Sequence, residues 1–290
     1  MSKDNSPFAR QKTSLSPENK KFAIIFSVCV LLIIAVSCLI ILAKNDFDVH
    51  TALGGDIKVT KEVKAEDTVD IAESDKYYLL WCSDSESDEL QFMWIVRAQM
   101  PGRRVTVFAP SVDEVVDYGS SANTFSRIYC SLGESGLKKA IENTYGIKIS
   151  KYIGSNTESF KQMINYLGSV TVDVSENIEY KGNFSLILMR GENDIKGDQL
   201  YKYLIYLAYE ELPDLSKRSD VLITILNSLF VPGRYAGVET VYSRIANLLV
   251  TDISIVDYSG AGKLIRYMYD NGISEAVVAR NIEELTAEAE

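Results

Sequence analysis

Residues 197–212 read GDQLYKYLIYLAYEEL, and this stretch decides the class of fold. The apolar positions that recur at helical spacing are Leu200, Tyr203, Leu204 and Leu207. Their spacing predicts a helix that buries one face. Two shorter apolar runs precede it, VTVDV at 170–174 and FSLILM at 184–189, and both have the length of strands. A helix with one buried face next to short buried strands predicts a mixed α/β core.

The same alternation of short and periodic segments extends outward in both directions. Short apolar or aromatic runs predict further strands at 77–83, 92–98 and 105–110. Apolar positions at helical spacing predict further helices at 137–146, 157–168, 219–230, 238–250 and 260–272. Thr157 is the expected N-cap of the second of these helices. Because strands alternate with helices, we expect an α/β/α sandwich with a central mixed sheet.

The N-terminal part of the chain contains the uncharged run FAIIFSVCVLLIIAVSCLIILA, Phe22–Ala43. At about 1.5 Å per residue this run is long enough to cross a bilayer core of about 30 Å. Residues 1–21 carry five basic and two acidic side chains, an excess that places the N-terminus in the cytoplasm. We therefore expect an uncleaved single-pass transmembrane helix. A cleaved signal peptide fits less well, because its apolar region usually has about 7–15 residues.

This pattern divides the chain into four regions. We expect a disordered cytoplasmic tail at 1–21, the transmembrane helix at 22–43, a linker or stalk at 44–75 and an extracytoplasmic domain at 76–290. The formal charge of the chain is −10, so we expect no nucleic-acid partner. For the two cysteines beyond the apolar run, Cys82 and Cys130, we expect two buried free thiols, although one disulfide is the alternative.

The residues that could carry chemistry are few. The single histidine, His50, lies in the linker, so the globular part holds no Ser–His–Asp or Cys–His pair and no histidine-based zinc site. The acidic stretch SDSESDE at 83–89 directly follows the first predicted strand. Its Asp84 and Asp88 are candidate ligands for Mg²⁺, because hard cations prefer carboxylate oxygens. The alternative is a solvated acidic loop.

Several motifs, taken in order, resemble one known family. The stretch YYLLWCSD is similar to a strand that ends in Leu-Leu-Gly-Asp, and RRVTVFAPSVDEV is similar to one that ends in Ser-Ile-Pro-Arg-Asp. The segment at 188–226 resembles a G-x-x-x-L-x-G motif followed by A-L-x-Y-x-R-x-R, and LLVTDISIVD resembles a Thr-Asp-hydrophobic-Ser piece. On these residues the chain is identified as a member of the LytR–CpsA–Psr family over residues 76–285.

The resemblance implies a single-pass membrane protein with an extracytoplasmic α/β/α domain. An apolar pocket of that domain would hold a polyprenyl chain. The implied activity is transfer of a glycopolymer from a polyprenyl pyrophosphate carrier to peptidoglycan, assisted by Mg²⁺. Arginines would clamp the pyrophosphate, since a diphosphate leaving group needs fixed positive charge.

Carrying the motifs over residue by residue puts this activity in question. Tyr203 matches the tyrosine of Y-x-R-x-R, but Ile205 and Leu207 occupy the two arginine positions and would line the polyprenyl pocket instead. Ser111 stands at the arginine position of the Pro-Arg-Asp motif. Each lost charge-assisted contact removes about 1.5–3 kcal/mol of binding. Arg218, just past the helix, is the best-placed candidate for a catalytic role.

Three hypotheses remain from the sequence. The first is a degenerate family member that binds lipid, glycopolymer, peptidoglycan or a catalytic paralogue without transfer. The second is an active transferase that recruits other arginines, Arg218 above all, with Asp84 retained as a Mg²⁺ ligand. The third is an unrelated membrane-anchored sensor or structural domain.

Overall fold

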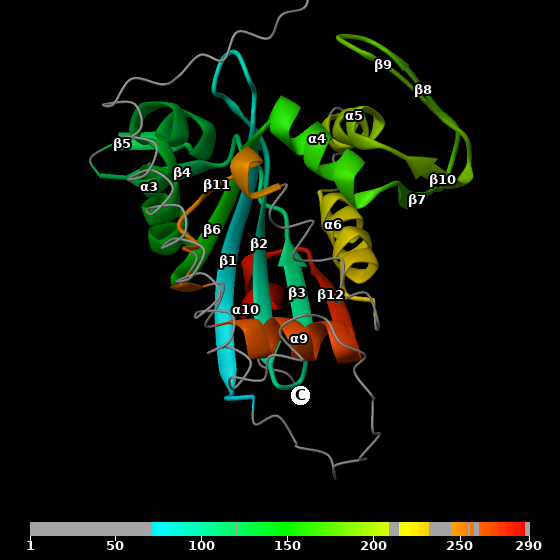
Figure 1. The fold of residues 1–290 in the computed structure, drawn as a ribbon. Coiled ribbons are helices and arrows are strands. Elements are labelled where there is room, and N and C mark those ends of the chain that lie inside the picture. Colours follow the sequence, from blue (N-terminus) through cyan, green and yellow to red (C-terminus); the bar gives the residue numbers. More distant parts are fainter. Residues whose placement is uncertain are drawn as a thin grey trace, which may run out of the picture. The chain divides into compact units, whose positions relative to one another are not determined.

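A six-stranded sheet forms the centre of the computed structural model, in the order β11-β6-β1-β2-β3-β12 (Figure 1). Its strands are β1 (Ser74–Ser83), β2 (Leu90–Met100), β3 (Arg104–Phe108), β6 (Ile149–Asn156), β11 (Val250–Thr251) and β12 (Glu275–Ala279). β1 runs antiparallel to β2 and parallel to β6, and β12 runs parallel to β3. The mixed sheet expected from the sequence is therefore confirmed.

The structure describes residues 71–119, 121–208, 215–231, 245–254, 256–257 and 261–287. The expected tail at 1–21, the apolar run at 22–43 and the linker as far as residue 70 lie outside these ranges. Within the described ranges, no helix is both long and apolar enough to span a bilayer. The described residues from 71 onward belong to one compact unit.

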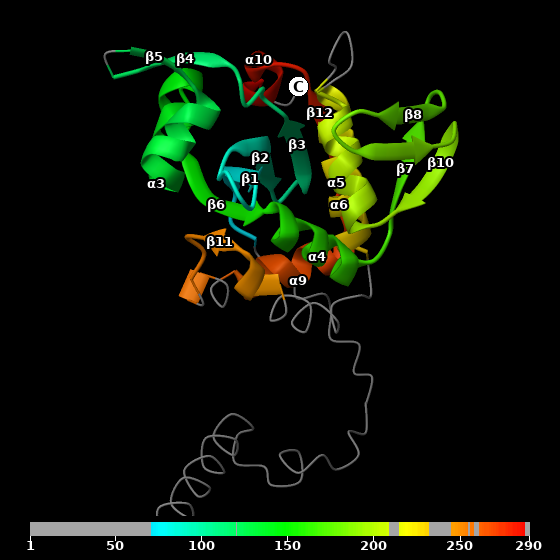
Figure 2. The same ribbon diagram turned by 90° about the horizontal axis from the view of Figure 1, so that it is seen from above.

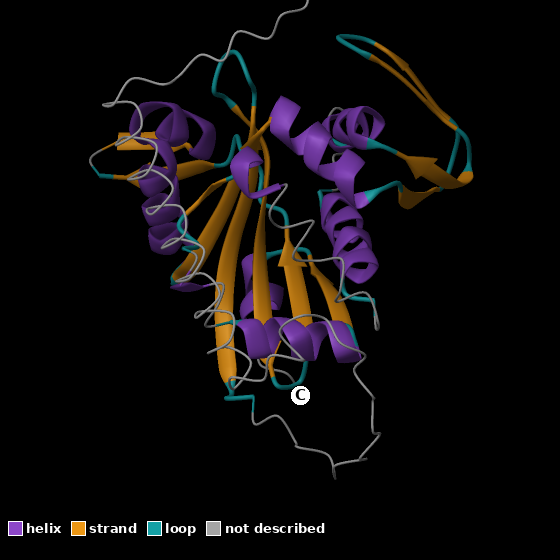
Figure 3. Cartoon of the chain, viewed as in Figure 1, coloured by secondary structure: helices purple, strands orange, loops and turns teal. Residues whose placement is uncertain are grey.

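Helices cover both faces of the sheet, as Figures 2 and 3 show. The helices are α3 (Phe125–Tyr145), α4 (Thr157–Leu167), α5 (Gly197–Tyr206), α6 (Ser216–Leu229), α9 (Gly262–Asn271) and α10 (Ile282–Thr286). α3 and α10 pack on one face in a core that includes Trp81 and Phe125. α4, α5 and α6 pack on the other face in a core that includes Cys82 and Phe92. The α/β/α arrangement follows from the alternation of side chains along β1 and β2.

Three small two-stranded sheets complete the described fold. They are formed by β4 (Val115–Tyr118) with β5 (Ser121–Thr124), β7 (Val170–Val174) with β10 (Gly191–Ile195), and β8 (Ile178–Lys181) with β9 (Ser185–Leu188). β7 contributes three buried valines to the core on the α5 face, whereas the β8–β9 hairpin extends away from the central sheet (Figure 1).

Local contacts explain how α4 and α5 come together. The expected cap of α4 is wrong by one residue, since Asn156 Oδ1 accepts the hydrogen bond from the backbone N–H of Ser159 at 2.8 Å. At the start of α5, a Cβ on Gly197 would collide with the carbonyl oxygen of Lys161 in α4. Glycine is therefore needed for the close approach of the two helices.

The helix expected at 238–250 ends earlier than predicted: among its described residues, Ile245 is still helical, but the helix does not continue to residue 250. Residues 246–248 form a single 3₁₀ turn, η1 (Ala246–Leu248), and β11 follows as an edge strand antiparallel to β6. Thr251 Oγ1 donates to the carbonyl of Tyr152, and Asp252 Oδ1 accepts from the N–H of the same residue at 2.8 Å. These polar contacts hold residues 251 and 252 against β6, directly after the 3₁₀ turn.

Candidate functional site

Arg218 lies in the first turn of α6 and is 2% exposed. Its Nε donates a hydrogen bond of 2.8 Å to the carbonyl of Leu204 in α5. Its guanidinium carbon lies 5.9 Å from the ring centre of Phe92, on β2. The side chain thus reaches from α6 across the end of α5 to the central sheet, inside the core on that face.

The guanidinium group of Arg218 makes one hydrogen bond with the described residues. Among the described residues, no carboxylate lies within ion-pair distance of its guanidinium, and its Nη atoms make no hydrogen bond. Burial lowers the pKa of Arg218 to about 10, so the side chain is still charged at neutral pH. A buried charge without a partner is costly. Arg218 is therefore a candidate contact for an anionic ligand.

Arg97 on β2 shows what a compensated buried arginine looks like in the same domain. It is 6% exposed, and its Nη2 lies 2.6 Å from Asp75 Oδ2, with a second bond from Nε to Asp75 Oδ1 at 2.9 Å. Its Nη1 donates to the carbonyls of Leu285 and Ala287. Arg97 therefore ties β1, β2 and the C-terminal segment together, which is a structural role.

The two arginine positions of the Y-x-R-x-R motif are filled by core residues. Ile205 is 8% exposed and Leu207 is 1% exposed, and both belong with Tyr203 to the core between the sheet and α4–α6. α5 ends at Tyr206, and Leu207 follows as its C-cap. These side chains pack inward, so the positions hold neither positive charge nor open space.

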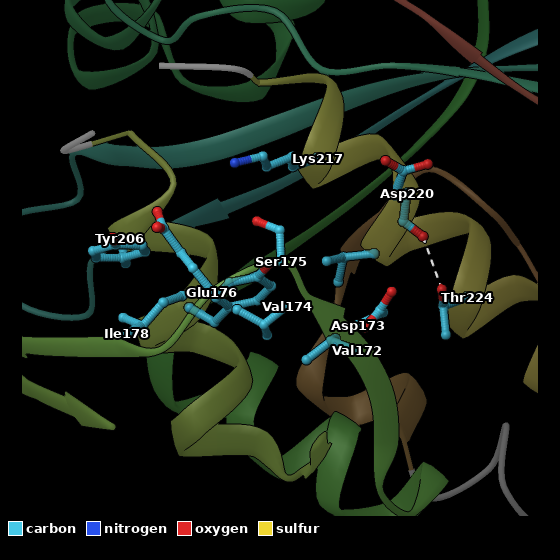
Figure 4. A pocket seen from close by; sticks show the side chains of 12 residues that line it. Val172, Asp173, Val174, Ser175, Glu176, Ile178, Tyr206, Lys217, Asp220 and Thr224 are labelled. Atoms are coloured by element: carbon cyan, nitrogen blue, oxygen red, sulfur yellow. Dashed lines mark hydrogen bonds between the residues drawn. The ribbon is translucent and has the colours of Figure 1, made fainter. Parts of the chain in front are cut away.

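A cavity of about 200 Å³ lies beside α5, between α6 and β7 (Figure 4). Tyr203 and Tyr206 of α5 line it, whereas Ile205 and Leu207 are not among its lining residues. Lys217 and Asp220 of α6 and Glu176 after β7 give it a charged lining. Pockets for drug-sized apolar ligands are mostly apolar and about 300–1,000 Å³ in volume. The cavity is therefore too small and too polar for a polyprenyl chain in this conformation.

The acidic loop after β1 is organised around Asp84. Its Oδ1 accepts from the backbone N–H groups of Glu86 and Ser87, each at 2.9 Å, and from Ser87 Oγ at 3.2 Å. The N–H groups of Ser87 and Glu86 lower the pKa of Asp84. Asp88 lies in the same loop with a φ of 57°. The described ranges contain no group of three or more His, Cys, Asp or Glu side chains that could hold a metal ion.

The structure brings only some of the sequence-derived candidates together. Tyr203, Ile205 and Leu207 share one core, and Arg218 is joined to it by its hydrogen bond to the carbonyl of Leu204. Asp84 and Asp88 lie in the β1–β2 loop, and in the described part of the chain no hydrogen bond or ion pair joins them to Arg218. That Asp84 and Asp88 bind a metal ion, and that Arg218 and its neighbours bind the ligand, stays a prediction.

Sequence reasoning missed the aromatic residues that position Arg218. Phe92 packs under the guanidinium, and the indole N–H of Trp94 donates to the carbonyl of Arg218 at 2.9 Å. Alternation along the strand predicted at 92–98 indicates which side chains share a face, but it cannot identify the helix that covers them. The expectation of two buried thiols was half wrong: both cysteines are free, Cys82 is buried with a pKa raised by burial to about 12, and Cys130 is exposed.

Comparison with known proteins matches the chain to one family. The family model described as the LytR_cpsA_psr family matches residues 108–286, more than half of the chain. A polyisoprenyl-teichoic acid–peptidoglycan teichoic acid transferase, TagV of Bacillus subtilis (strain 168), is 21% identical over 174 residues, which is 56% of this chain. The match spans 42% of that relative, so the chain covers less than half of its length.

Solved structures share the fold at low sequence identity. The crystal structure of B. subtilis TagV superposes with a TM-score of 0.60 at 15% identity, covering 71% of this chain and 84% of the other. A transcriptional regulator from Enterococcus faecalis gives a TM-score of 0.58 at 14% identity, covering 70% and 74%. TagT bound to LI-WTA gives 0.54 at 16% identity, covering 70% and 77%. With the family model matched over most of the described domain, the chain belongs to the LytR_cpsA_psr family.

Proposed function

We propose that this chain acts in the assembly of cell-wall glycopolymers as a binding member of its family that has lost the transfer chemistry. Family membership and the teichoic acid transferase activity for which TagV is named support a glycopolymer as the ligand class. The third hypothesis, an unrelated sensor, is wrong because the chain belongs to the family. The bound species would be a polyprenyl-linked glycopolymer, peptidoglycan or a catalytic paralogue.

The observation that carries this proposal is the burial of Ile205 and Leu207. At 8% and 1% exposure they are part of the packed core, where the family motif has arginines. A pyrophosphate clamp depends on guanidinium groups that stabilise the charge of the leaving group, and aliphatic side chains cannot supply it. Because loss of one such donor lowers rates by about 10²–10³, loss of two together brings transfer close to background.

The proposal places the domain outside the cell on a membrane anchor. Its support is the uncharged run at 22–43 with its basic N-terminal flank, which predicts a single-pass helix with a cytoplasmic N-terminus. An anchor would keep the domain at the surface where polyprenyl carriers reside. The domain boundaries at 21, 43 and 75 are part of this proposal.

The residues present give only partial support for Mg²⁺. A Mg²⁺ ion usually takes one or two protein carboxylates together with substrate phosphates. Asp84 already spends one oxygen on the turn of its own loop, and the described part of the chain offers no ready-made group of ligands. No step of the proposed function depends on a metal.

The test uses the full chain in lipid nanodiscs with a short-chain polyprenyl pyrophosphate and the matching polyprenol, followed by calorimetry. A parallel assay supplies the lipid-linked glycopolymer and peptidoglycan and measures transfer. Binding of the lipid without transfer above the protein-free rate supports the proposal. Absence of lipid and polymer binding, or transfer well above that rate, overturns it.

A second candidate function is favoured by one specific observation. Arg218 is buried, charged and without a carboxylate partner among the described residues, so its guanidinium group could bind an anionic ligand. An active transferase could use it as its remaining phosphate contact. Arg218→Lys decides this point, because lysine keeps the charge but loses the planar fork that holds phosphate oxygens. Transfer that falls at least tenfold in this variant would establish the active enzyme.

A further inference from the structure

A second cavity lies where two parallel strands of the central sheet end side by side. β1 and β6 are paired in parallel, with Trp81 opposite Gly154 and Ser83 opposite Asn156. A cavity of about 280 Å³ opens beside these residues and is bounded further by α3, the start of α4 and the segment 247–250. In open α/β sheets, ligands bind outside the carboxyl ends of the strands. Its position at the ends of these strands therefore makes this cavity a candidate ligand site.

The floor of the cavity is aromatic. Trp81 contributes to the lining and belongs to the core on the α3 face, whereas Arg218 packs on the opposite face of the sheet. The indole lies against Gly154, where a Cβ would collide with the ring. Glycine at this position therefore leaves the space that the indole occupies. The ring of Tyr129, also in the lining, lies 5.8 Å from the indole in an edge-to-face arrangement. The indole N–H of Trp81 is buried and has no hydrogen-bond partner in the described structure.

The rim of the cavity carries amides and hydroxyls that are not committed elsewhere. Asn156 uses its Oδ1 to cap α4, which leaves its amide N–H groups available. Asn247 and Ser159 line the cavity and make no side-chain hydrogen bond to another described residue. Among the described residues that line the cavity, Asp88 is the only charged one, and none is a lysine, arginine or histidine.

We propose that this cavity binds an uncharged saccharide unit, an N-acetylhexosamine of the cell-wall polymers. A sugar ring has an apolar face that packs on aromatic side chains and a rim of hydroxyls that exchange hydrogen bonds with amides and hydroxyls. The described lining lacks a cation, which disfavours phosphate, and its polar rim disfavours a lipid chain. The choice of a cell-wall sugar rests on the proposed function, while the saccharide chemistry rests on the lining itself.

The test titrates the full chain, in nanodiscs, with the disaccharide of N-acetylglucosamine and follows binding by calorimetry. Tyr129→Ala removes the aromatic wall, and Asn156→Asp keeps the capping oxygen of α4 while removing the amide donor. Each is expected to weaken binding about fivefold to tenfold, the loss given by one aromatic contact or one net hydrogen bond. Tyr166→Ala is the matched control, since Tyr166 is 51% exposed on α4 and lines neither cavity.

The outcomes separate this inference from the proposed function. Saccharide binding that weakens in both cavity variants and not in the control establishes the site. Saccharide binding that is absent, or equal in all four proteins, overturns it. If the same preparations still bind polyprenyl pyrophosphate, the proposed function stands while the saccharide site falls. Cellobiose, which lacks the acetamido groups, is expected to bind more weakly, and equal affinity would refute recognition of the N-acetyl group.

Discussion

Replacing Arg218 with methionine is expected to leave stability almost unchanged, although the side chain is almost completely buried. Methionine is unbranched and flexible, so it can fill the channel that the arginine stem occupies between α5, α6 and Phe92. The variant removes the charge and keeps most of the apolar contact. It therefore isolates the energetic effect of the guanidinium group.

The magnitude follows from three opposing terms. Burial lowers the pKa of Arg218 from 12.5 to about 10, and each pKa unit corresponds to about 1.36 kcal/mol, so keeping the charge buried costs about 3 kcal/mol. The charged hydrogen bond to Leu204 returns about 1.5–3 kcal/mol, and the contact with the Phe92 ring returns at most about 2 kcal/mol. These terms nearly cancel, so we expect a change of about 1 kcal/mol or less, in either direction.

Arg97→Met provides the contrast. This arginine holds Asp75 through two nitrogens and two backbone carbonyls through a third, so its charge is fully used. Removing one partner of such a buried pair costs about 3–5 kcal/mol, and the partial exposure of Asp75 favours the lower end. The two arginines thus have similar burial and opposite expected effects.

Urea unfolding of the full chain in detergent, followed by tryptophan fluorescence, measures both variants. Calorimetry with polyprenyl pyrophosphate and polyprenol then asks whether Arg218→Met removes any preference for the pyrophosphate. A loss of about 3 kcal/mol in Arg218→Met, equal to that in Arg97→Met, would refute the reasoning, because it would show that the protein's own contacts with the guanidinium group outweigh the cost of burying it. Intact stability with a lost preference for pyrophosphate would identify Arg218 as a ligand contact.

Three further predictions concern the core, an edge strand and the acidic loop. Leu207→Arg places a charge at a 1% exposed position, so unfolding experiments should show a loss of more than about 3 kcal/mol and transfer assays no gain; a stable variant with new transferase activity would contradict this. Asp252→Ala removes the acceptor for the N–H of Tyr152 and should cost about 1–3 kcal/mol, with faster hydrogen exchange at that amide; unchanged exchange would argue against the contact. The carboxylate of Asp84 is stabilised by N–H groups, so its folded pKa is depressed and its contribution is present above the ordinary pKa of 3.8. The stability advantage over Asp84→Ala should therefore shrink as pH falls below 3.8, and an advantage that persists at lower pH would oppose this assignment.

Sequence patterns predicted the strands whose apolar residues are continuous or alternate regularly, and missed strands without such a pattern. The runs at 77–83 and 105–110 lie in central strands with buried ends, and both were found. β6 was missed because four of its eight residues are only half-buried and polar residues interrupt its pattern. β12 was missed because it is a short edge strand whose partner, β3, lies more than 160 residues earlier in the chain. Pairings over such separations leave no local signal.

The candidate site was predictable only where a motif marked it. The resemblance singled out Tyr203 and Arg218, and the strand predicted at 92–98 includes Phe92 and Trp94, whose contacts with Arg218 were not predicted. The lack of a charge partner for Arg218 depends on three elements meeting in space, which no local pattern records. The lining of the second cavity was out of reach for the same reason, because Trp81, Tyr129 and Asn247 come from distant segments.

The end of β1 links the two proposals physically. Neighbouring residues on a strand point to opposite faces, so Trp81 faces the α3 core and the saccharide cavity, whereas Cys82 faces the core that holds Arg218. A polymer joined to a lipid carrier has chemically distinct ends, one apolar and anionic, the other composed of sugars. A sheet with separate binding regions on its two faces could hold these ends independently, which a binding member without transfer chemistry would still require. Substitutions at Tyr129 and Arg218 should then be additive in their effects on binding the complete lipid-linked polymer, since separated sites without shared partners do not couple.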